Sequence, residues 1–312
     1  MTTILITGSN GFIGASFAKR VRARQWRVLG VDLQPTDLTG CCDEYRQIDL
    51  GTPEALRSLC ALSSPEVILH AGGISGFMVE TDNPTRIGAV NIAGTMSVLE
   101  LARRSAVRRT VICSSIMAYG PDRVPNSLRV ESEYPEPISV YGASKVAAEA
   151  LMHAYRGQYG IDTIALRFGH VYGPGRTTQC FIRDMLAAVR TQQPCRIPHA
   201  SKSLRQYVYI DDICRSIDLA LAVPAPATRV INVTAGELHT LREVQAAIAR
   251  QYGALQVSFG DDVDLPNYRI GMLDLSRASA DLGFRPRFPL AVGIQDYWSK
   301  FDMSDVTSNS IM

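Results

Sequence analysis

The sequence predicts an α/β fold in which a doubly wound parallel sheet carries a smaller, discontinuous C-terminal lobe. Three observations lead to this prediction. Short β-rich runs alternate with segments of helical period through the first half of the chain, a glycine-rich turn follows the first run, and the pattern loosens after residue 168. With 312 residues, of which 46% are hydrophobic, the chain is long enough to bury a large core.

The elements of the first half alternate, and each helix begins after a polar residue or a proline. The expected strands cover residues 4–7, 28–32, 67–70, 110–114 and 163–168. The expected helices cover residues 12–24, 53–62, 84–105 and 140–159. Because a helical crossover brings the chain back to the end of the sheet where the previous strand began, this alternation predicts that neighbouring strands pair in parallel.

The second half is expected to build the smaller lobe. Gly173-Pro174-Gly175 and Gln193-Pro194 interrupt the pattern. A strand and a helix over 206–221, the helix beginning at Asp211 and Asp212, predict a return to the main domain. The expected division is a cofactor-binding domain over 1–168 with the return of 206–235, a substrate-binding lobe over 169–205 and 236–301, and a flexible tail over 302–312.

Charge and cysteine usage exclude several classes of protein. The net charge of +2 is near balance, and we interpret the cluster Arg103, Arg104, Arg108 and Arg109 as a solvated helix end, where cations suit the helix dipole, rather than as a nucleic-acid surface. The seven cysteines form no C-x-x-C pair and have no zinc-type spacing, so we expect reduced thiols and no metal site. Without a signal segment or an 18-residue apolar run, we expect a cytoplasmic protein that makes no membrane contact.

A turn with three glycines, Gly8-Ser9-Asn10-Gly11-Phe12-Ile13-Gly14, directly follows the first expected strand. Glycine permits a tight turn, close approach of backbone amides to a pyrophosphate, and close packing of helix on strand. The N-terminus of the following helix faces the phosphates. We therefore expect Gly8, Asn10, Gly11, Phe12, Ile13 and Gly14 to bind a dinucleotide.

Asp32 indicates that the dinucleotide is NAD. This residue ends the second expected strand, 18 residues after Gly14, where a carboxylate can accept hydrogen bonds from the ribose hydroxyls. The 2′-phosphate of NADP would be repelled there, at a cost of about 3 kcal/mol for each charge pair at ~5 Å and an effective dielectric of ~20. Asp49 and Leu50, after the third strand, are expected to flank the adenine.

The segment Tyr141-Gly142-Ala143-Ser144-Lys145 carries the expected acid/base pair, because residues four apart share one face of a helix. A tyrosine that exchanges a proton with a carbohydrate hydroxyl near neutral pH needs its phenolate stabilised by about 4 kcal/mol, which Lys145 and an oxidised nicotinamide can supply together. Ser115, at the end of the strand over 110–114, is expected to polarise the reacting oxygen, with Ser114 as the reserve candidate.

Together these segments resemble the extended short-chain dehydrogenase/reductase family, the NAD-dependent epimerase/dehydratase group. Further ordered matches extend over nearly the whole chain: Asn91-Ile92-Ala93-Gly94-Thr95 is similar to N-V-x-G-T, residues 166–174 to L-R-x-x-N-V-Y-G-P, and residues 206–212 to D-F-V-Y-V-D-D. The resemblance implies a Rossmann-like domain that carries NAD and a lobe that closes over a sugar-type substrate, often in a homodimer with a four-helix interface. It also implies cofactor contacts at Ala71, Gly72, Asn91 and Phe168, and a substrate contact at Ser75.

Departures from the family pattern narrow the reaction. Ile116 and Met117 stand where the family's dehydratases carry an Asp-Glu pair, so dehydration is not expected. His170 replaces a substrate-binding asparagine of the nucleotide-sugar enzymes, and the stretch 175–182 is short. His170 is therefore expected to bind a smaller anionic or polyhydroxyl substrate, and Arg205 and Arg269 a carboxylate or a phosphate.

Two reactions stay open. In an NAD-dependent nucleotide-sugar 4-epimerase, hydride leaves a secondary alcohol and returns to the opposite face. In an NAD-dependent dehydrogenase of a free sugar or sugar acid, the oxidised product and NADH are released. The first is favoured by the resemblance and the second by His170. A binding protein without activity is disfavoured, because Ser115, Tyr141 and Lys145 are all present.

Overall fold

The computed structural model describes residues 1–75, 83–122, 124, 127–262 and 270–302. The main domain is built on a parallel seven-stranded sheet of order β11-β6-β5-β4-β1-β2-β3. Its strands are β1 (Thr3–Thr7), β2 (Arg27–Asp32), β3 (Glu44–Gln47), β4 (Val67–His70), β5 (Arg109–Ser115), β6 (Thr163–Phe168) and β11 (Val230–Val233). This order confirms the predicted doubly wound, Rossmann-like sheet, with its switch point between β1 and β4.

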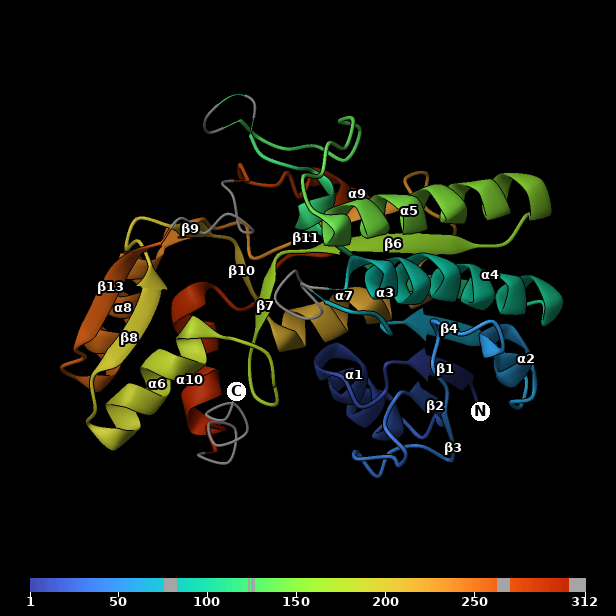
Figure 1. The fold of residues 1–312 in the computed structure, drawn as a ribbon, viewed down its shortest axis with the longest axis horizontal. Coiled ribbons are helices and arrows are strands. Elements are labelled where there is room, and N and C mark those ends of the chain that lie inside the picture. Colours follow the sequence, from blue (N-terminus) through green and yellow to red (C-terminus); the bar gives the residue numbers. More distant parts are fainter. Residues whose placement is uncertain (76–82, 123, 125–126, 263–269, 303–312) are drawn as a thin grey trace.

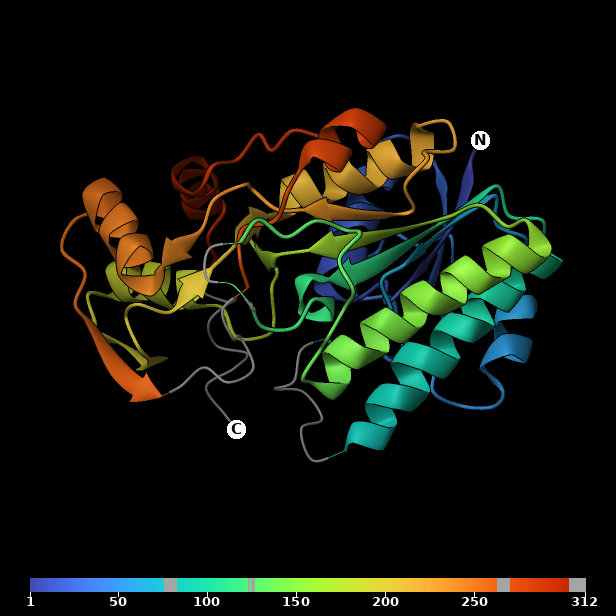
Figure 2. The ribbon, with the colours of Figure 1, turned by 90° about the horizontal axis from the view of Figure 1, so that it is seen from above.

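Helices cover both faces of this sheet (Figure 1). One face carries α1 (Phe12–Arg22), α7 (Ile210–Ala222) and the short α9 (Ser276–Leu282); the other carries α2 (Ala55–Cys60), α3 (Pro84–Gly88), α4 (Gly94–Arg104) and α5 (Val140–Tyr159). Figure 2 shows α4 and α5 side by side, on the face opposite α7. Two separate apolar clusters, one around Phe17 and Ile213 and one around Leu99 and Met152, fill the two interfaces.

The smaller lobe lies beyond the carboxyl ends of the strands and contains three short strand pairs (Figure 1). Strand β7 (His170–Tyr172) pairs with β10 (Tyr207–Tyr209), β8 (Cys195–His199) with β13 (Val257–Asp262), and β9 (Leu204–Arg205) with β12 (His239–Thr240). Its helices are α6 (Phe181–Thr191), α8 (Leu241–Tyr252) and α10 (Leu290–Ser299). Within the returning segment, α7 packs on the main sheet and β11 pairs with β6, whereas β10 pairs with β7 of the lobe. The expected domain boundaries stay a prediction.

Local sequence signals explain where the central helices begin and end. Ser139 caps α5 by accepting a hydrogen bond from the Gly142 backbone, and Gly160 ends the helix in the left-handed conformation at φ +71°. Asn83 caps α3, with Pro84 at its first position. The helix expected over 84–105 is interrupted by a π-helical turn at Ala89–Ala93, which the sequence pattern does not indicate.

The arginine cluster corrects one interpretation. Arg103 and Arg104 do end α4 and pair with Glu100, but Arg109 lies inside β5 with 4% of its surface exposed. Its guanidinium is paired with Asp162 and donates a hydrogen bond to the carbonyl of Ala220. A buried charge is tolerated only when it is paired in this way. Arg109 is therefore a structural residue, and the expectation of a solvated helix end was wrong for it.

Three remaining expectations concern the whole molecule. All seven cysteines are unbridged. Over the residues that the structure describes, no helix is long and apolar enough to cross a membrane, and no group of three or more His, Cys, Asp or Glu side chains could hold a metal ion. The expected flexible tail begins at Asp302, and residues 303–312 lie outside the described part of the chain.

Candidate active site

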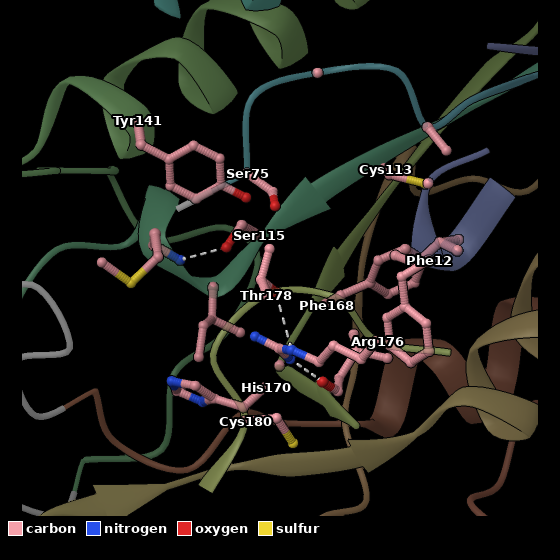
Figure 3. A pocket seen from close by; sticks show the side chains of 18 of the residues that line it. Phe12, Ser75, Cys113, Ser115, Tyr141, Phe168, His170, Arg176, Thr178 and Cys180 are labelled. Carbon is pink, nitrogen blue, oxygen red and sulfur yellow. Dashed lines mark hydrogen bonds between the residues drawn. The ribbon is translucent and has the colours of Figure 1, made fainter. Parts of the chain in front are cut away.

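A cavity of about 360 Å³ lies at the carboxyl edge of the sheet, between the sheet and the lobe (Figure 3). Five parts of the main domain reach it: the glycine turn, the segment after β4, the end of β5, the start of α5 and the end of β6. From the lobe side it is bounded by β7, residues 176–181, Arg205 and Tyr207. Among the residues predicted for the site, Gly8, Gly11, Phe12, Ile13, Gly14, Ala71, Ser75, Ser115, Tyr141, Lys145, Phe168, His170 and Arg205 line this cavity.

The glycine turn is packed so closely that two of its glycines leave no room for a side chain. Gly8 has φ +67°, and a Cβ there would lie 2.8 Å from the Cα of Gly72. A Cβ on Gly14 would clash with the Gly8 carbonyl oxygen. The first turn of α1 therefore sits directly on the loop, and its N-terminus faces the cavity through Phe12 and Ile13.

Asp32 and Asn10 shape the adjacent end of the turn. The carboxylate of Asp32 accepts hydrogen bonds from the backbone N–H groups of Asn10 (3.0 Å) and Gln34 (3.2 Å). The Asn10 side chain closes the following loop, donating to the carbonyl of Thr36 (2.9 Å) and accepting from the N–H of Leu38 (2.8 Å). Neither residue lines the cavity. Asn10 therefore positions the loop around the predicted ribose site. Direct contacts of Asn10 and Asp32 with the cofactor stay predictions.

Asp49 and Leu50 also lie away from the cavity lining. Asp49 pairs with Arg86 (2.8 Å) and accepts a hydrogen bond from the Gly51 backbone, and these interactions hold the pKa of its carboxyl below the ordinary value despite desolvation. Leu50 is buried and packs against Gly72, where an added Cβ would lie 2.9 Å from its Cδ1. Their predicted contacts with adenine stay predictions.

A buried hydrogen-bonded chain fixes the loop after β4. The hydroxyl of Thr95 donates to the Asn91 carbonyl (2.6 Å), so its oxygen accepts from Nε2 of His70 (3.0 Å). Nδ1 of His70 then accepts from Thr7 (2.7 Å), whose oxygen accepts from the N–H of Gly72 (3.0 Å). This order of donors requires a neutral imidazole. Burial lowers the pKa of His70 to about 3, with a smaller contribution from Lys145, consistent with that state.

Asn91 connects the same loop to α5. Its side-chain oxygen accepts from the N–H of Ile74 (2.8 Å), and its nitrogen donates to the Ile74 carbonyl (3.0 Å) and to the Ser144 hydroxyl (3.0 Å). Asn91 is 3% exposed and lies on the π-helical turn, behind the cavity wall. The structure thus gives it a positioning role, and a direct contact with the cofactor stays a prediction.

Figure 3 shows Tyr141, Ser115 and Ser75 together at one end of the cavity, which Lys145 also lines. The Lys145 ammonium lies 5.6 Å from the centre of the Tyr141 ring and donates a hydrogen bond to the Cys113 carbonyl (2.9 Å). The Ser115 oxygen accepts from the N–H of Met117 (3.2 Å), which leaves its hydroxyl hydrogen for another partner. Ser114, the reserve candidate, donates instead to Glu149 (2.5 Å). The geometry therefore favours Ser115.

Glu149 is a supporting residue that the sequence reasoning missed. It lies one turn after Lys145 on α5, and its carboxylate binds Ser114 of β5 and, through two hydrogen bonds of 2.9 and 2.7 Å, Arg167 of β6. The Arg167 guanidinium also lies 4.4 Å from the centre of the Tyr119 ring. Because both charged groups are buried, this ion pair fixes α5 against the two strands. A glutamate four residues after the lysine was the available signal.

The lobe side of the cavity carries positive charge. Arg205 is 3% exposed, and desolvation by burial lowers its pKa. His170 lies beside Tyr207, with ring centres 6.1 Å apart. Arg176, which the sequence reasoning also missed, donates to the Val171 carbonyl and, through Nε, to the Thr178 hydroxyl (3.1 Å; Figure 3). Its position directly after Gly173-Pro174-Gly175 could have indicated it. Arg269 lies outside the described residues.

Comparisons with known proteins agree with this geometry. A model of the NAD dependent epimerase/dehydratase family matches residues 4–234. The chain is 31% identical to a UDP-glucose 4-epimerase of Mycolicibacterium smegmatis, covering 93% of this chain and 95% of that protein, and 25% identical to a UDP-glucuronate 4-epimerase of Thermodesulfobacterium geofontis, covering 97% and 98%. The solved structure of MoeE5 in complex with UDP-glucose and NAD superposes with a TM-score of 0.84, at 26% identity, covering 96% of this chain and 98% of that one.

Proposed function

Because the chain belongs to the NAD-dependent epimerase/dehydratase family, we propose that it is a nucleotide-sugar 4-epimerase in which Ser115, Tyr141 and Lys145 act on a sugar hydroxyl beside bound NAD. The observation that carries the proposal is the meeting of these three side chains with the glycine turn in one cavity. Relatives that match over nearly their whole length, named UDP-glucose and UDP-glucuronate 4-epimerases, support the same reaction.

The glycine turn fits NAD. Its closely packed backbone leaves no room for side chains at Gly8 and Gly14, and the N-terminus of α1 is aimed into the cavity, as an anionic pyrophosphate requires. Asp32 ends β2, and the proposal expects its carboxylate to accept hydrogen bonds from the ribose hydroxyls. NAD, when bound, supplies the acceptor that takes up the hydride of the sugar carbinol and returns it.

The residues of this chain move the proton. Tyr141 accepts the proton of the sugar hydroxyl and later gives it back, and the Lys145 ammonium stabilises the phenolate in between. A cation ~5 Å from a phenolate oxygen contributes about 3 kcal/mol at an effective dielectric of ~20. Ser115 donates a hydrogen bond to the same sugar oxygen, and the buried Tyr141 ring, 8% exposed, keeps water from the transferred proton.

A panel of sugars tests the proposed reaction. The protein is incubated with NAD and UDP-sugars, free aldoses or aldonates, while epimers are followed by NMR and NADH by absorbance. We expect interconversion of 4-epimers of a UDP-sugar without net NADH. Stoichiometric NADH with a free sugar or sugar acid, and no epimer, would instead establish the dehydrogenase that the sequence left as the alternative.

The outer face of α4 and α5 supports a homodimer. Met96, Ala143 and Ala150 are exposed along these adjacent helices, as is Ala93 directly before α4, and 47% of the Met96 surface is accessible. Small side chains allow a second pair of helices to approach closely. Sedimentation should therefore give twice the mass of one chain, and Ala150→Glu should halve that mass.

A reducing compartment fits the cysteines. Seven unbridged thiols, of which Cys113, Cys180, Cys195 and Cys214 are buried, accord with a cytoplasmic location. Burial raises the pKa of Cys113 to about 12, so this thiol beside the cavity stays protonated and unreactive.

A further inference from the structure

The charged side chains that line the cavity are all positive. Lys145, Arg176 and Arg205 contribute positive charge, and no Asp or Glu occurs among the described residues that line the cavity. Lys145 is engaged with Tyr141 and the Cys113 carbonyl. The two arginines lie on the lobe side, away from the glycine turn, which binds phosphate through backbone amides. Arg176 is therefore available to the substrate.

Arg176 is held rigidly without a counter-charge. Nη1 donates to the Val171 carbonyl and Nε to the Thr178 hydroxyl, while its own backbone carbonyl accepts from Nη1 of the buried Arg183 (2.7 Å). Over the part of the chain that the structure describes, Arg176 makes no ion pair with a carboxylate, and its Nη2 makes no hydrogen bond. A fixed guanidinium with one open edge is suited to a carboxylate or phosphate oxygen.

The position of Arg176 identifies the part of the substrate that it meets. Phe168, at the end of β6, is the register partner of Ser115 on β5, and Val171, which holds Arg176, is three residues further on. Arg176 and Thr178 line the same cavity as Tyr141 and Ser115, and Figure 3 shows all four side chains around it. The anion is therefore expected close to the carbon that reacts.

We propose that Arg176, assisted by Thr178, binds a carboxylate on the sugar ring, so that the substrate is a nucleotide-linked uronic acid rather than a neutral hexose. This inference rests on the proposed 4-epimerase function. In a pyranose the reacting C4 is next to C5, which carries the carboxylate of a uronic acid, whereas the diphosphate on C1 is at the opposite end of the ring. An anion-binding group facing the reacting end therefore meets the carboxylate and not the diphosphate.

The test compares UDP-glucuronate with UDP-glucose as substrates of the NAD-loaded enzyme. We expect kcat/KM to favour UDP-glucuronate in the wild type, and Arg176→Gln to lower kcat/KM for UDP-glucuronate about 100-fold while changing that for UDP-glucose less than about 3-fold. The ratio of the two values in one preparation does not depend on the fraction of folded protein. Arg196→Gln, at an exposed arginine on β8 of the same lobe, is the matched control and should leave the ratio unchanged.

Each contrary result has its own meaning. Equal losses for both UDP-sugars in Arg176→Gln would overturn the inference, because they would assign Arg176 a purely structural role. A wild-type preference for UDP-glucose would overturn it as well and leave the epimerase function intact. If the wild type epimerises neither UDP-sugar, both the inference and the proposed function fail.

Discussion

The two walls of the cavity are built differently. The sheet wall consists of long, buried elements, β5 and α5, supported from behind by the Glu149–Arg167 ion pair and by the hydrogen bonds of His70 and Asn91. The lobe wall consists of three-residue strands and a loop that present His170 and Arg176. Under the proposed function, we expect the sheet wall to determine the chemistry and the lobe wall to select the substrate. Substitutions in the sheet wall should lower the activity with all substrates alike, whereas substitutions in the lobe wall should affect some substrates more than others.

Tyr141→Phe tests the sheet wall most directly. Without the phenol oxygen no group remains to exchange the proton, so we expect kcat to fall by at least about 1000-fold for every substrate, while the Kd of NAD changes only a few fold. Steady-state kinetics and calorimetric titration of NAD measure the two effects. Tyr134→Phe, at a tyrosine with 82% of its surface exposed, is the control. Turnover retained by Tyr141→Phe would refute the assignment.

Glu149→Gln removes the charge with which α5 pairs to Arg167 of β6. It leaves the buried Arg167 guanidinium uncompensated, so the free energy of unfolding should fall by about 3 kcal/mol. Urea denaturation measures the change, and Glu54→Gln, at an exposed glutamate, should have almost no effect. A loss below about 1 kcal/mol would show that the ion pair does not secure α5.

Asp32→Asn separates cofactor choice from substrate choice. Removing the carboxylate relieves its repulsion of a 2′-phosphate, so the preference for NAD over NADP should weaken about 10- to 100-fold, with no change in the relative use of two sugars. The Kd values of both dinucleotides give the preference, and Asp261→Asn, at an exposed position in the lobe, is the control. Equal affinities for NAD and NADP in the wild type would contradict the role of Asp32.

Because of His70, the stability of the protein depends on pH. Its folded pKa of about 3 lies below the ordinary 6.5, so the unfolded chain binds a proton that the folded protein excludes. Stability is therefore complete above pH ~6.5 and falls as the pH drops towards ~3, by about 1.4 kcal/mol per pH unit for this one group. In His70→Gln that part of the slope should disappear, whereas His153→Gln, on the exposed side of α5, should keep it. Parallel stability curves for wild type and His70→Gln would contradict this.

The sequence predicted the sheet wall better than the lobe wall, for a physical reason. The expected bounds of α5 and β6 agree with the structure, because a serine cap, a terminal glycine and an uninterrupted apolar run act within a few residues. Arg109 was misassigned because a run of arginines does not reveal which one will be buried and paired with a distant aspartate. Arg176 was missed although it directly follows Gly173-Pro174-Gly175, because its hydrogen bonds to Val171 and Thr178 form only when the loop has folded against β7.

The sequence by itself determined the α/β class, the glycine turn, and the spacing that puts Tyr141 and Lys145 on one helix face, since these depend on local geometry and period. Only the tertiary structure decided that Ser115 rather than Ser114 offers its hydroxyl, that Asn91 acts from behind the wall, and that Arg176 enters the cavity. These outcomes depend on which side chains compete for the same partner. That competition exists only after segments far apart in the chain have packed together.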